Sequence, residues 1–466
     1  MLADLYTTGT LQQIDGPLLF LRRNLDVGLN DAVEVVGVDG RGRLGRVATL
    51  DEETIVVEVL ESTAGLGLEG PRVRFFGEPL LSSVGAGLLG RVFDGVGRPL
   101  DGGPPVPGTK RWRIDGMPLN PVARAQPRDF IETGISTIDL MNSLVRGQKL
   151  PIFSGGGLPH DRMAVEIAQH ARLPKDDQGR FAIVFAGIGI SYDTAEYFRR
   201  AMEESGALAH TALFLNLASD PSTQRLLTPR FALTAAEYLA FAEGRHVLVI
   251  LTDMTNYCEA LREVAASHGE IPGRKGYPAY LYSDLATLFE RAGQLRERPG
   301  TLTQMPILTM PADDISHPIP DLTGYITEGQ VVLSRELNQK NVYPPVAVLP
   351  SLSRLMKDGI GAGFTFADHA PLANQLYAAY ARATRMRVLA SVVGTEGLGT
   401  VDLEFLRFAD RFERDFLAQH GARTLEESAE LGWRALRGLP VHELSRLDDA
   451  QIAAHLAPDP AGDDDG

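Results

Sequence analysis

The fold of this chain is constrained most by a regular alternation of apolar strands and helical stretches that begins at Gln148. Runs such as FAIVFAGI and HVLVILTD are apolar almost throughout, and a stretch with helical periodicity follows each of them. Strands that are apolar on both faces are typical of a sheet covered on both sides, as the helices of βαβ crossovers provide. The sequence therefore predicts a mostly parallel α/β domain.

The first helix of this domain is expected from Asp161 to Leu173. Its apolar residues recur three or four positions apart, so one stripe of the helix can pack against the sheet. This stripe comprises Met163, Ala164, Ile167, Ala168 and Ala171.

A different pattern precedes the α/β domain. Within residues 1–76, short β-branched runs alternate with glycine turns from Gly16 to about Phe76, which predicts a small antiparallel β-barrel. Residues 77–121 contain too many glycines and prolines for a helix. We interpret them as a structured connector at the start of a core domain that spans residues 77–349.

The pattern after residue 349 is helical. Residues 350–455 predict a C-terminal helical domain, because long apolar periods such as NQLYAAYARATRMRVLASVV are separated by a glycine-rich break. The acidic segment 456–466 has no apolar period and is expected to be disordered.

Composition excludes several classes of function. The chain has 466 residues, 44% apolar and 23% charged, as expected for a soluble protein of about three domains. Its net charge of −15, with no basic stripe, opposes binding to nucleic acid or anionic lipid. The single cysteine, Cys258, cannot form an intrachain disulfide, which indicates a reducing cytoplasm.

Two further patterns are missing from the sequence. The first residues carry no signal-peptide pattern, and no apolar run approaches the ~20 residues that span a bilayer, so any link to a membrane is expected to be indirect. The histidines are scattered and form no HExxH pattern, so no metal site is expected.

The turn between KLPIFS and the first helix lies where a nucleotide-binding domain places its phosphate loop. A working loop reads GxxxxGK[ST], in which backbone N–H groups and the lysine bind phosphates and the hydroxyl binds Mg²⁺. Here Pro159, His160 and Asp161 replace the second glycine, the lysine and the hydroxyl residue. Proline lacks an N–H group, neutral histidine lacks a permanent charge, and a carboxylate repels phosphate. We expect no nucleotide on this degenerate loop: Ser154, Gly155, Gly156, Gly157, Pro159, His160 and Asp161.

Three long segments point to a family. They are TGISTIDLMNSLVRGQKLPIFSGGGLPH from Thr133, the segment from Leu251 to Gly293 that ends in YLYSDLATLFERAG, and PSLSRLMKDGIG from Pro350. They resemble the B, or beta, subunit of V-type and archaeal-type rotary ATPases, and the similarity covers essentially the whole chain. The resemblance implies an N-terminal β-barrel, a central RecA-like parallel α/β domain and a C-terminal helical domain.

The resemblance also implies a role in an assembly. B subunits alternate with catalytic A subunits in a hexameric ring around a central rotor stalk, with a peripheral stalk and, indirectly, a membrane ion-translocating sector as further partners. Such a complex couples ATP synthesis or hydrolysis to proton or sodium transport at the cytoplasmic face of the membrane. We expect this chain to bind no cofactor alone, and Mg-ATP or ADP at the boundary between A and B to be held mainly by A.

One position separates the chain from catalytic relatives. Those relatives keep a glutamate shortly after the next strand to activate the attacking water, and the matching place here is Ile190. An aliphatic side chain cannot polarise water. The chain is therefore expected to lack independent catalytic activity.

Arg354, in PSLSRLMK, is the candidate catalytic residue. In the family this position corresponds to an arginine finger that reaches the γ-phosphate held by the adjacent A subunit. A guanidinium suits that task, because it donates two N–H groups to phosphate oxygens and does not deprotonate. Ser351, Ser353 and Lys357 are expected only to support the conformation of this loop.

Three other features are given structural interpretations. Asp253 lies at the Walker B position, and we expect it to cap the following helix. Arg274 and Lys275 lie beside Tyr277 and Tyr280, which we interpret as a subunit contact or loop packing, not RNA binding. The adjacent carboxylates Asp313 and Asp314 are interpreted as part of a conformational loop near the nucleotide interface.

Two alternative functions remain open at this stage. One is a catalytically active ring ATPase of an export or flagellar motor, and the other is a hexameric RNA translocase. Both need an intact phosphate loop, which Pro159, His160 and Asp161 oppose, and the translocase also needs a basic channel.

Overall fold

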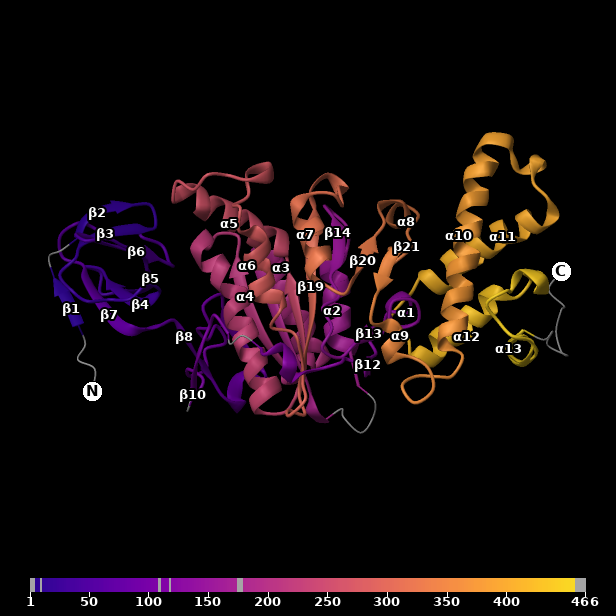
Figure 1. Ribbon diagram of the computed structural model, residues 1–466, viewed down its shortest axis with the longest axis horizontal. Helices are drawn as coiled ribbons and strands as arrows, with labels where there is room; N and C mark the ends of the chain where they lie inside the picture. Colours follow the sequence, from indigo (N-terminus) through magenta and orange to yellow (C-terminus); the bar gives the residue numbers. More distant parts are fainter. Residues whose placement is uncertain (1–4, 9–10, 108–109, 117–118, 174–178, 457–466) are drawn as a thin grey trace.

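Three parts succeed one another along the longest axis of the molecule. The computed structural model describes residues 5–8, 11–107, 110–116, 119–173 and 179–456. A β-rich N-terminal part, a layered α/β middle and a helical C-terminal part follow one another (Figure 1). This architecture confirms the predicted fold class.

The N-terminal part is an antiparallel barrel of seven strands in the order β1-β7-β4-β5-β6-β3-β2. Its core is built from valine, leucine, isoleucine and phenylalanine side chains that alternate along the strands. Two strands precede Gly16, the expected start of the barrel, and Gly16 turns the chain between β2 and β3 at φ 55°. The strands are β1 (Leu5–Thr8), β2 (Leu11–Asp15), β3 (Leu18–Arg22), β4 (Asp31–Val36), β5 (Gly42–Leu50), β6 (Thr54–Val59) and β7 (Arg72–Pro79).

The segment interpreted as a connector contributes strands of its own. β8 (Leu81–Val84) pairs antiparallel with β10 (Lys110–Arg113). β9 (Arg91–Asp94) pairs parallel with β16 (Thr211–Leu217) and so forms one edge of the central sheet. The described part of this segment therefore contains regular strands, one of which completes the sheet of the core.

The central sheet follows the order β21-β20-β14-β19-β17-β15-β16-β9. Its neighbours pair in parallel except β20 with β21, and β18 (Gly293–Leu295) adds an antiparallel pairing to β19. The strands are β14 (Ile152–Gly155), β15 (Phe181–Ile190), β17 (His246–Thr252), β19 (Thr301–Met310), β20 (Gly329–Leu333) and β21 (Val346–Ser353).

Helices cover both faces of this sheet. α4 (Ser222–Glu237), α5 (Met254–Ser267) and α6 (Leu281–Phe289) belong to one apolar core, and α2 (His160–His170) and α3 (Tyr192–Ser205) belong to the other. Within β15, Val184 faces the first core and Phe185 the second. Because successive residues enter different cores, the strand is apolar along its whole length, which is the pattern seen in the sequence.

Helix α2 ends at His170, before the predicted end at Leu173. The chain leaves the helix because Arg172 pairs with Glu132 as in an antiparallel bridge, with backbone hydrogen bonds of 2.9 and 3.1 Å. The predicted apolar stripe of α2 is confirmed, because Met163 and Ile167 are fully buried.

The C-terminal part begins later than expected from the sequence. Residue 350, the expected boundary, lies inside β21, which continues to Ser353 as an edge strand of the central sheet. The helices that follow are α9 (Met356–Gly359), α10 (His369–Val393), α11 (Thr400–Arg411), α12 (Leu425–Leu436) and α13 (Asp449–His455). Of the acidic segment predicted to be disordered, residues 457–466 lie outside the described residues.

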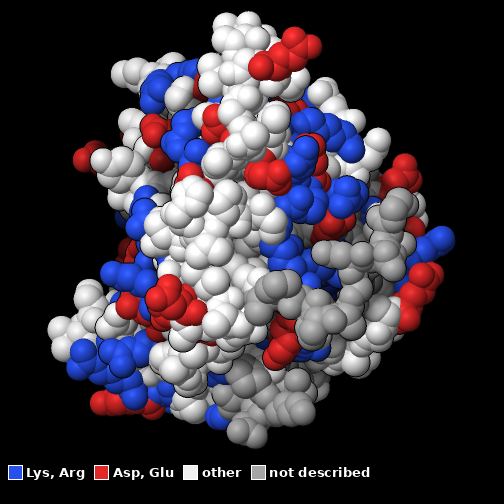
Figure 2. Space-filling view, turned by 90° about the vertical axis from the view of Figure 1, so that its right-hand side faces the viewer, with Lys and Arg blue, Asp and Glu red and all other residues white. Residues whose placement is uncertain are grey.

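The C-terminal end of the molecule has a mixed surface. Basic and acidic side chains are interspersed on it around an uncharged band (Figure 2). The described part of this face therefore carries no extended area of one charge sign. Among the described helices, none is long and apolar enough to cross a membrane.

Candidate functional site

The degenerate phosphate loop joins β14 to α2 and closes on itself. The N–H of Leu158 donates to the carbonyl of Gly155 at 3.1 Å, and the N–H of His160 donates to the carbonyl of Leu158 at 2.9 Å. The His160 ring turns back to the buried Ser154, with 2.9 Å between Nδ1 and Oγ. Two backbone donors of the loop, the N–H groups of Leu158 and His160, are thus bonded inside the turn and do not face a phosphate.

An ion pair of the chain itself lies against this loop. Arg335, the first residue of α8 (Arg335–Gln339), donates to both carboxylate oxygens of Asp313 at 2.7 and 2.9 Å. It also donates to the carbonyl of Gly156 at 3.0 Å. A Cβ atom on Gly155 would lie only 2.1 Å from Asp313 Oδ1, so the carboxylate touches the loop backbone. The hydrogen bonds from Arg335 lower the pKa of Asp313, which keeps it anionic.

Arg335 was not identified from the sequence. The feature that could have identified it is its position after a strand, because β20 runs parallel to β14 and Arg335 follows the carboxyl end of β20. Parallel strands bring the residues after their carboxyl ends to the same edge of a sheet. The topology, which the sequence alone did not give, therefore places Arg335 beside the phosphate loop.

Two further carboxylates add negative charge near the loop. The pKa of Asp161 is raised, chiefly by burial and also by the charge of Asp253, and the nearby His160 offsets only part of this increase. Asp253 caps α5 by accepting a hydrogen bond of 2.8 Å from the N–H of Thr255, which confirms its predicted capping role. Its carboxylate also accepts from the N–H of Thr309 at 3.1 Å. A polyphosphate at this loop would meet the carboxylate of Asp161 where a working site has a hydroxyl group that binds Mg²⁺, and would lack the charge of a lysine.

Ile190 lies at the end of β15, the position compared with a catalytic glutamate. Its side chain is 6% exposed and packs in the core shared with α2 and α3. A Cβ atom on Gly187 would lie 2.5 Å from Ile190 Cδ1, which shows how closely the hydrocarbon packs on the strand. The side chain is thus part of the core and offers no proton acceptor.

Arg354 directly follows β21 and is exposed. It lines a cavity of about 520 Å³ together with Asn142, Asn374 and Tyr377. Its Nη1 donates to the carbonyl of Thr327 at 3.0 Å. This contact fixes one corner of the guanidinium and leaves its other N–H groups for a ligand.

Arg354 and the phosphate loop occupy opposite edges of the sheet. Gly155 ends β14, whereas Ser353 pairs with Gly329 at the beginning of β20, which is parallel to β14. The degenerate loop therefore lies at the carboxyl ends of these strands and Arg354 at the amino end of β20. The two features do not form one site within the chain.

The residues flanking Arg354 fix its strand. Ser351 Oγ accepts from the N–H of Val332 at 2.9 Å, and Ser353 Oγ donates to the carbonyl of Ser143 at 2.9 Å. Both serines are buried, whereas Lys357 is exposed and lines the same cavity as Arg354.

The basic and acidic pairs noted in the sequence meet between loops. Lys275 pairs with Asp314 at 3.3 Å, and Arg274 donates to the carbonyl of Ser316 at 3.2 Å. Loop packing, one of the two interpretations of this pair, thus has direct contacts. Asp313 and Asp314 bind different cations and do not form a carboxylate pair. No cluster of three or more metal-binding side chains occurs among the described residues.

Comparisons with known proteins cover all three parts of the chain. The model of the ATP synthase alpha/beta family, nucleotide-binding domain, matches residues 134–353, and the beta-barrel domain of that family matches residues 11–77. The C-terminal domain of V and A type ATP synthase matches residues 358–456.

Full-length relatives agree with these matches. The chain is 53% identical to a V-type ATP synthase beta chain 2 of Treponema pallidum over 448 residues, 96% of this chain and 93% of the relative. It is 52% identical to a V-type ATP synthase beta chain of Halothermothrix orenii over 441 residues, 94% and 95% of the two chains. A solved ATP synthase subunit, NeqB from Nanoarcheaum equitans, is 37% identical with a TM-score of 0.72, covering 90% of this chain and 98% of that one.

Proposed function

Because the chain belongs to the ATP synthase alpha/beta family, as a B (beta) chain of the V and A type, we propose that it is the non-catalytic subunit of the ring and donates Arg354 to a neighbouring A subunit. The observation that carries this proposal is the contrast between the two ends of the parallel strands in the central sheet. At the carboxyl ends lies a phosphate loop that is closed by its own hydrogen bonds and covered by the Asp313–Arg335 ion pair. At the amino end of β20 lies the exposed Arg354, beside a cavity.

Arg354 supplies charge to a reaction that the chain does not perform alone. Phosphoryl transfer depends mainly on positioning and on stabilising the charge that develops on the phosphate oxygens. With one N–H group held by the Thr327 carbonyl, the guanidinium can still donate a fork of N–H groups to those oxygens. Arginines that act in this way contribute about 10³ to 10⁵ in rate.

The nucleotide belongs mainly to the partner in this proposal. Mg-ATP or ADP lies at the boundary between A and B and is bound chiefly by A, because the loop of this chain offers His160 in place of the lysine and the carboxylate of Asp161 in place of the hydroxyl group. The further partners are the central and peripheral stalk subunits. The complex then couples ATP synthesis or hydrolysis to proton or sodium transport at the cytoplasmic face of a membrane.

A binding experiment separates this proposal from an active ring ATPase or an RNA translocase. Equilibrium titration of the isolated chain with Mg-ATP is expected to show no high-affinity binding. Either alternative requires clear binding by the chain itself, since both need an intact phosphate loop. Tight binding at the loop, lost on substitution of Gly156 or Gly157, contradicts the non-catalytic assignment.

Substitution of Arg354 tests the donated charge. In the assembled ATPase, Arg354→Ala is expected to leave ring assembly intact and to lower turnover by about 10³-fold or more. Arg354→Lys is expected to rescue little, because an ammonium cannot reproduce the planar fork. Lys357→Ala, three residues on, is the matched control. Normal turnover of the Arg354→Ala complex refutes the assignment.

A further inference from the structure

The turn formed by Thr327 and Glu328 binds Arg354 at two points. The N–H of Arg354 donates to the carbonyl of Glu328 at 2.9 Å, and its Nη1 donates to the carbonyl of Thr327 at 3.0 Å. Both the backbone and the guanidinium of Arg354 are therefore fixed to one turn, which leads into β20. The direction of the guanidinium depends on where that turn lies.

A buried glutamine ties the turn to the strand that carries Arg354. Gln148 is fully buried, and its Nε2 donates to the carbonyl of Glu328 at 3.1 Å and to Ser353 Oγ at 2.9 Å. Its Oε1 accepts from the N–H of Val145 at 3.0 Å. One amide thus holds the residue before Arg354 and the carbonyl that Arg354 binds, and burial makes any lost partner costly.

Lys149 fixes the same turn through the Glu328 side chain. The carboxylate of Glu328 accepts from the Lys149 N–H at 2.8 Å and pairs with its Nζ at 2.8 Å. The Lys149 side chain is only 6% exposed, and its Nζ also pairs with Glu290 at 2.8 Å. Glu328 and Glu290 therefore bind one cation at equal distance, but only Glu328 belongs to the turn that holds Arg354.

We propose that Gln148 and Glu328 are positioning residues that set the direction of Arg354, an inference that rests on the proposed function of that arginine. Both act through the Thr327–Glu328 turn. Gln148 holds the Thr327–Glu328 turn against β21, and the Glu328 carboxylate holds the same turn against Lys149, so the guanidinium is aligned before the neighbouring subunit presents its phosphate. Alignment in advance avoids an ordering cost at the moment of reaction, and a displacement of about 1 Å can cost as much as 10²-fold in rate.

The experiment compares two glutamates on one lysine. In the assembled complex, Glu328→Gln is expected to lower kcat by about tenfold or more and to leave the KM for Mg-ATP within about twofold, since A holds the nucleotide. Glu290→Gln removes the other partner of Lys149 and is expected to leave kcat within about twofold. Glu290 also contacts Arg124 at 3.4 Å, so Glu290→Gln alters two contacts of a carboxylate, as Glu328→Gln does.

A double substitution distinguishes positioning from general destabilisation. In the Arg354→Ala background, measured in single turnover at high complex concentration, Glu328→Gln is expected to cost less than about twofold more. A merely structural role would lower activity to the same extent in both backgrounds. Equal kcat values for the Glu328→Gln and Glu290→Gln complexes, or full additivity with Arg354→Ala, overturn the inference.

Further outcomes keep this inference separable from the proposed function. If Arg354→Ala itself turns over normally, the proposed function fails. If Arg354→Ala is inactive and Glu328→Gln is normal, only the positioning role fails. Should Glu328→Gln prevent assembly, Ser353→Ala removes the hydroxyl between Gln148 and the strand with little change of volume, and its kcat is expected to fall by several-fold; a normal kcat for that complex also overturns the inference.

Discussion

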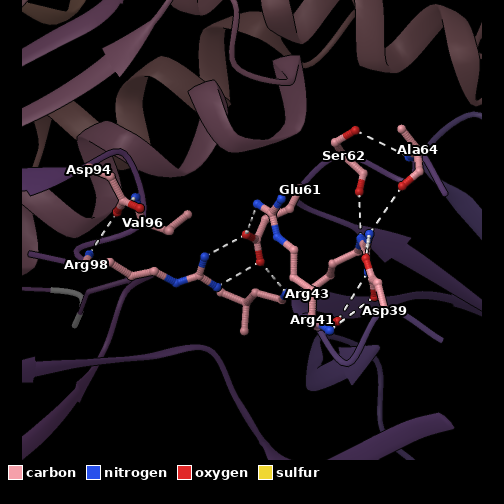
Figure 3. A network of polar contacts seen from close by, with 10 residues as sticks. Asp39, Arg41, Arg43, Glu61, Ser62, Ala64, Asp94, Val96 and Arg98 are labelled. Atoms are coloured by element: carbon pink, nitrogen blue, oxygen red, sulfur yellow. Dashed lines mark hydrogen bonds and ion pairs between the residues drawn. The ribbon is translucent and has the colours of Figure 1, made fainter. Parts of the chain in front are cut away.

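Glu61 and Arg98 form a bidentate ion pair that joins the barrel to the core domain. Arg98, in the turn after β9, donates to the two carboxylate oxygens of Glu61 at 2.6 and 2.8 Å (Figure 3). Glu61 follows β6 and also accepts from the N–H of Leu44 at 2.6 Å. Its side chain is 6% exposed, so the carboxylate depends on these donors for its solvation.

Arg98→Ala is expected to weaken the junction between barrel and core. The substitution leaves a buried carboxylate without its main cation, at a cost of about 1 to 3 kcal/mol; this is less than for a fully buried pair, since Arg98 is 49% exposed. Thermal unfolding followed at neutral pH measures the loss. Arg41→Ala is the control, because Arg41 is 63% exposed and lies 3.9 Å from the same carboxylate. Equal midpoints for the two variants would contradict this prediction.

The same pair predicts an acid-sensitive junction. Burial raises the pKa of Glu61, but the hydrogen bonds from Arg98 and Leu44 outweigh it, and the net pKa is lowered. The stabilisation is present above the ordinary glutamate pKa of about 4.3 and is lost as the pH falls through the lower folded-state pKa. Glu61→Gln is therefore expected to reduce stability at pH 7 and to flatten its decline below about pH 5. Unfolding midpoints from pH 7 to pH 3.5 test this, and parallel curves would oppose it.

Removing the carboxylate that covers the phosphate loop should improve anion binding. Asp313→Asn frees Arg335 from its ion pair and removes a negative charge in contact with Gly155. We expect the affinity of the isolated chain for pyrophosphate to rise by about five- to tenfold, as the loss of about 1 kcal/mol of repulsion implies. Calorimetric titration measures it. Asp314→Asn is the matched control, because Asp314 pairs with Lys275 and not with Arg335. Equal affinities for both variants would show that Asp313 does not shield the loop.

Adjacent glycines of the loop should differ in their tolerance of a side chain. The added Cβ of Gly155→Ala would lie 2.1 Å from Asp313 Oδ1, whereas that of Gly156→Ala would meet nothing within 4 Å. We expect Gly155→Ala to destabilise the chain by about 1 to 3 kcal/mol and Gly156→Ala to be nearly neutral. In an Asp313→Ala background the cost of Gly155→Ala is expected to shrink. Unfolding midpoints of the four variants decide, and an unchanged cost in that background would locate the strain elsewhere.

His369 should make the C-terminal part sensitive to mild acid. His369 is the first residue of α10 and is fully buried. Its two ring nitrogens lie 3.0 Å from the Leu140 carbonyl and 3.0 Å from Thr365 Oγ1. Burial, partly offset by the hydrogen bond to Leu140, lowers the pKa of His369 to about 4. Below the ordinary value of about 6.5 the unfolded chain takes up a proton that the folded chain does not, so stability falls as the pH falls from about 6.5 to about 4.

The expected loss from this histidine is about 2 kcal/mol between pH 7.5 and pH 5. His369→Gln can still donate to the Leu140 carbonyl but does not titrate. Its unfolding midpoint is expected to be lower than that of the natural chain at pH 7.5 and to change less with pH. If the two curves stay parallel, His369 does not carry this dependence.

Local sequence accounts for much of the architecture. The continuous apolar character of β15 follows from burial on both faces, and the apolar stripe of α2 follows from helical spacing, so both could be predicted. The end of α2 could not, because the pairing of Arg172 with Glu132 joins residues 40 positions apart. The predicted domain boundary at residue 350 fell inside β21 for a similar reason, because the pairing of β21 with β20 is a tertiary contact.

The chemistry absent from the phosphate loop was determined by the sequence alone. Pro159, His160 and Asp161 lack the donors and charge of a working loop in any fold that the chain could adopt. Only the tertiary structure decided what lies against that loop and what holds Arg354. Arg335 and Gln148 act on residues far from them in the chain, and such contacts depend on which strands become neighbours in the sheet.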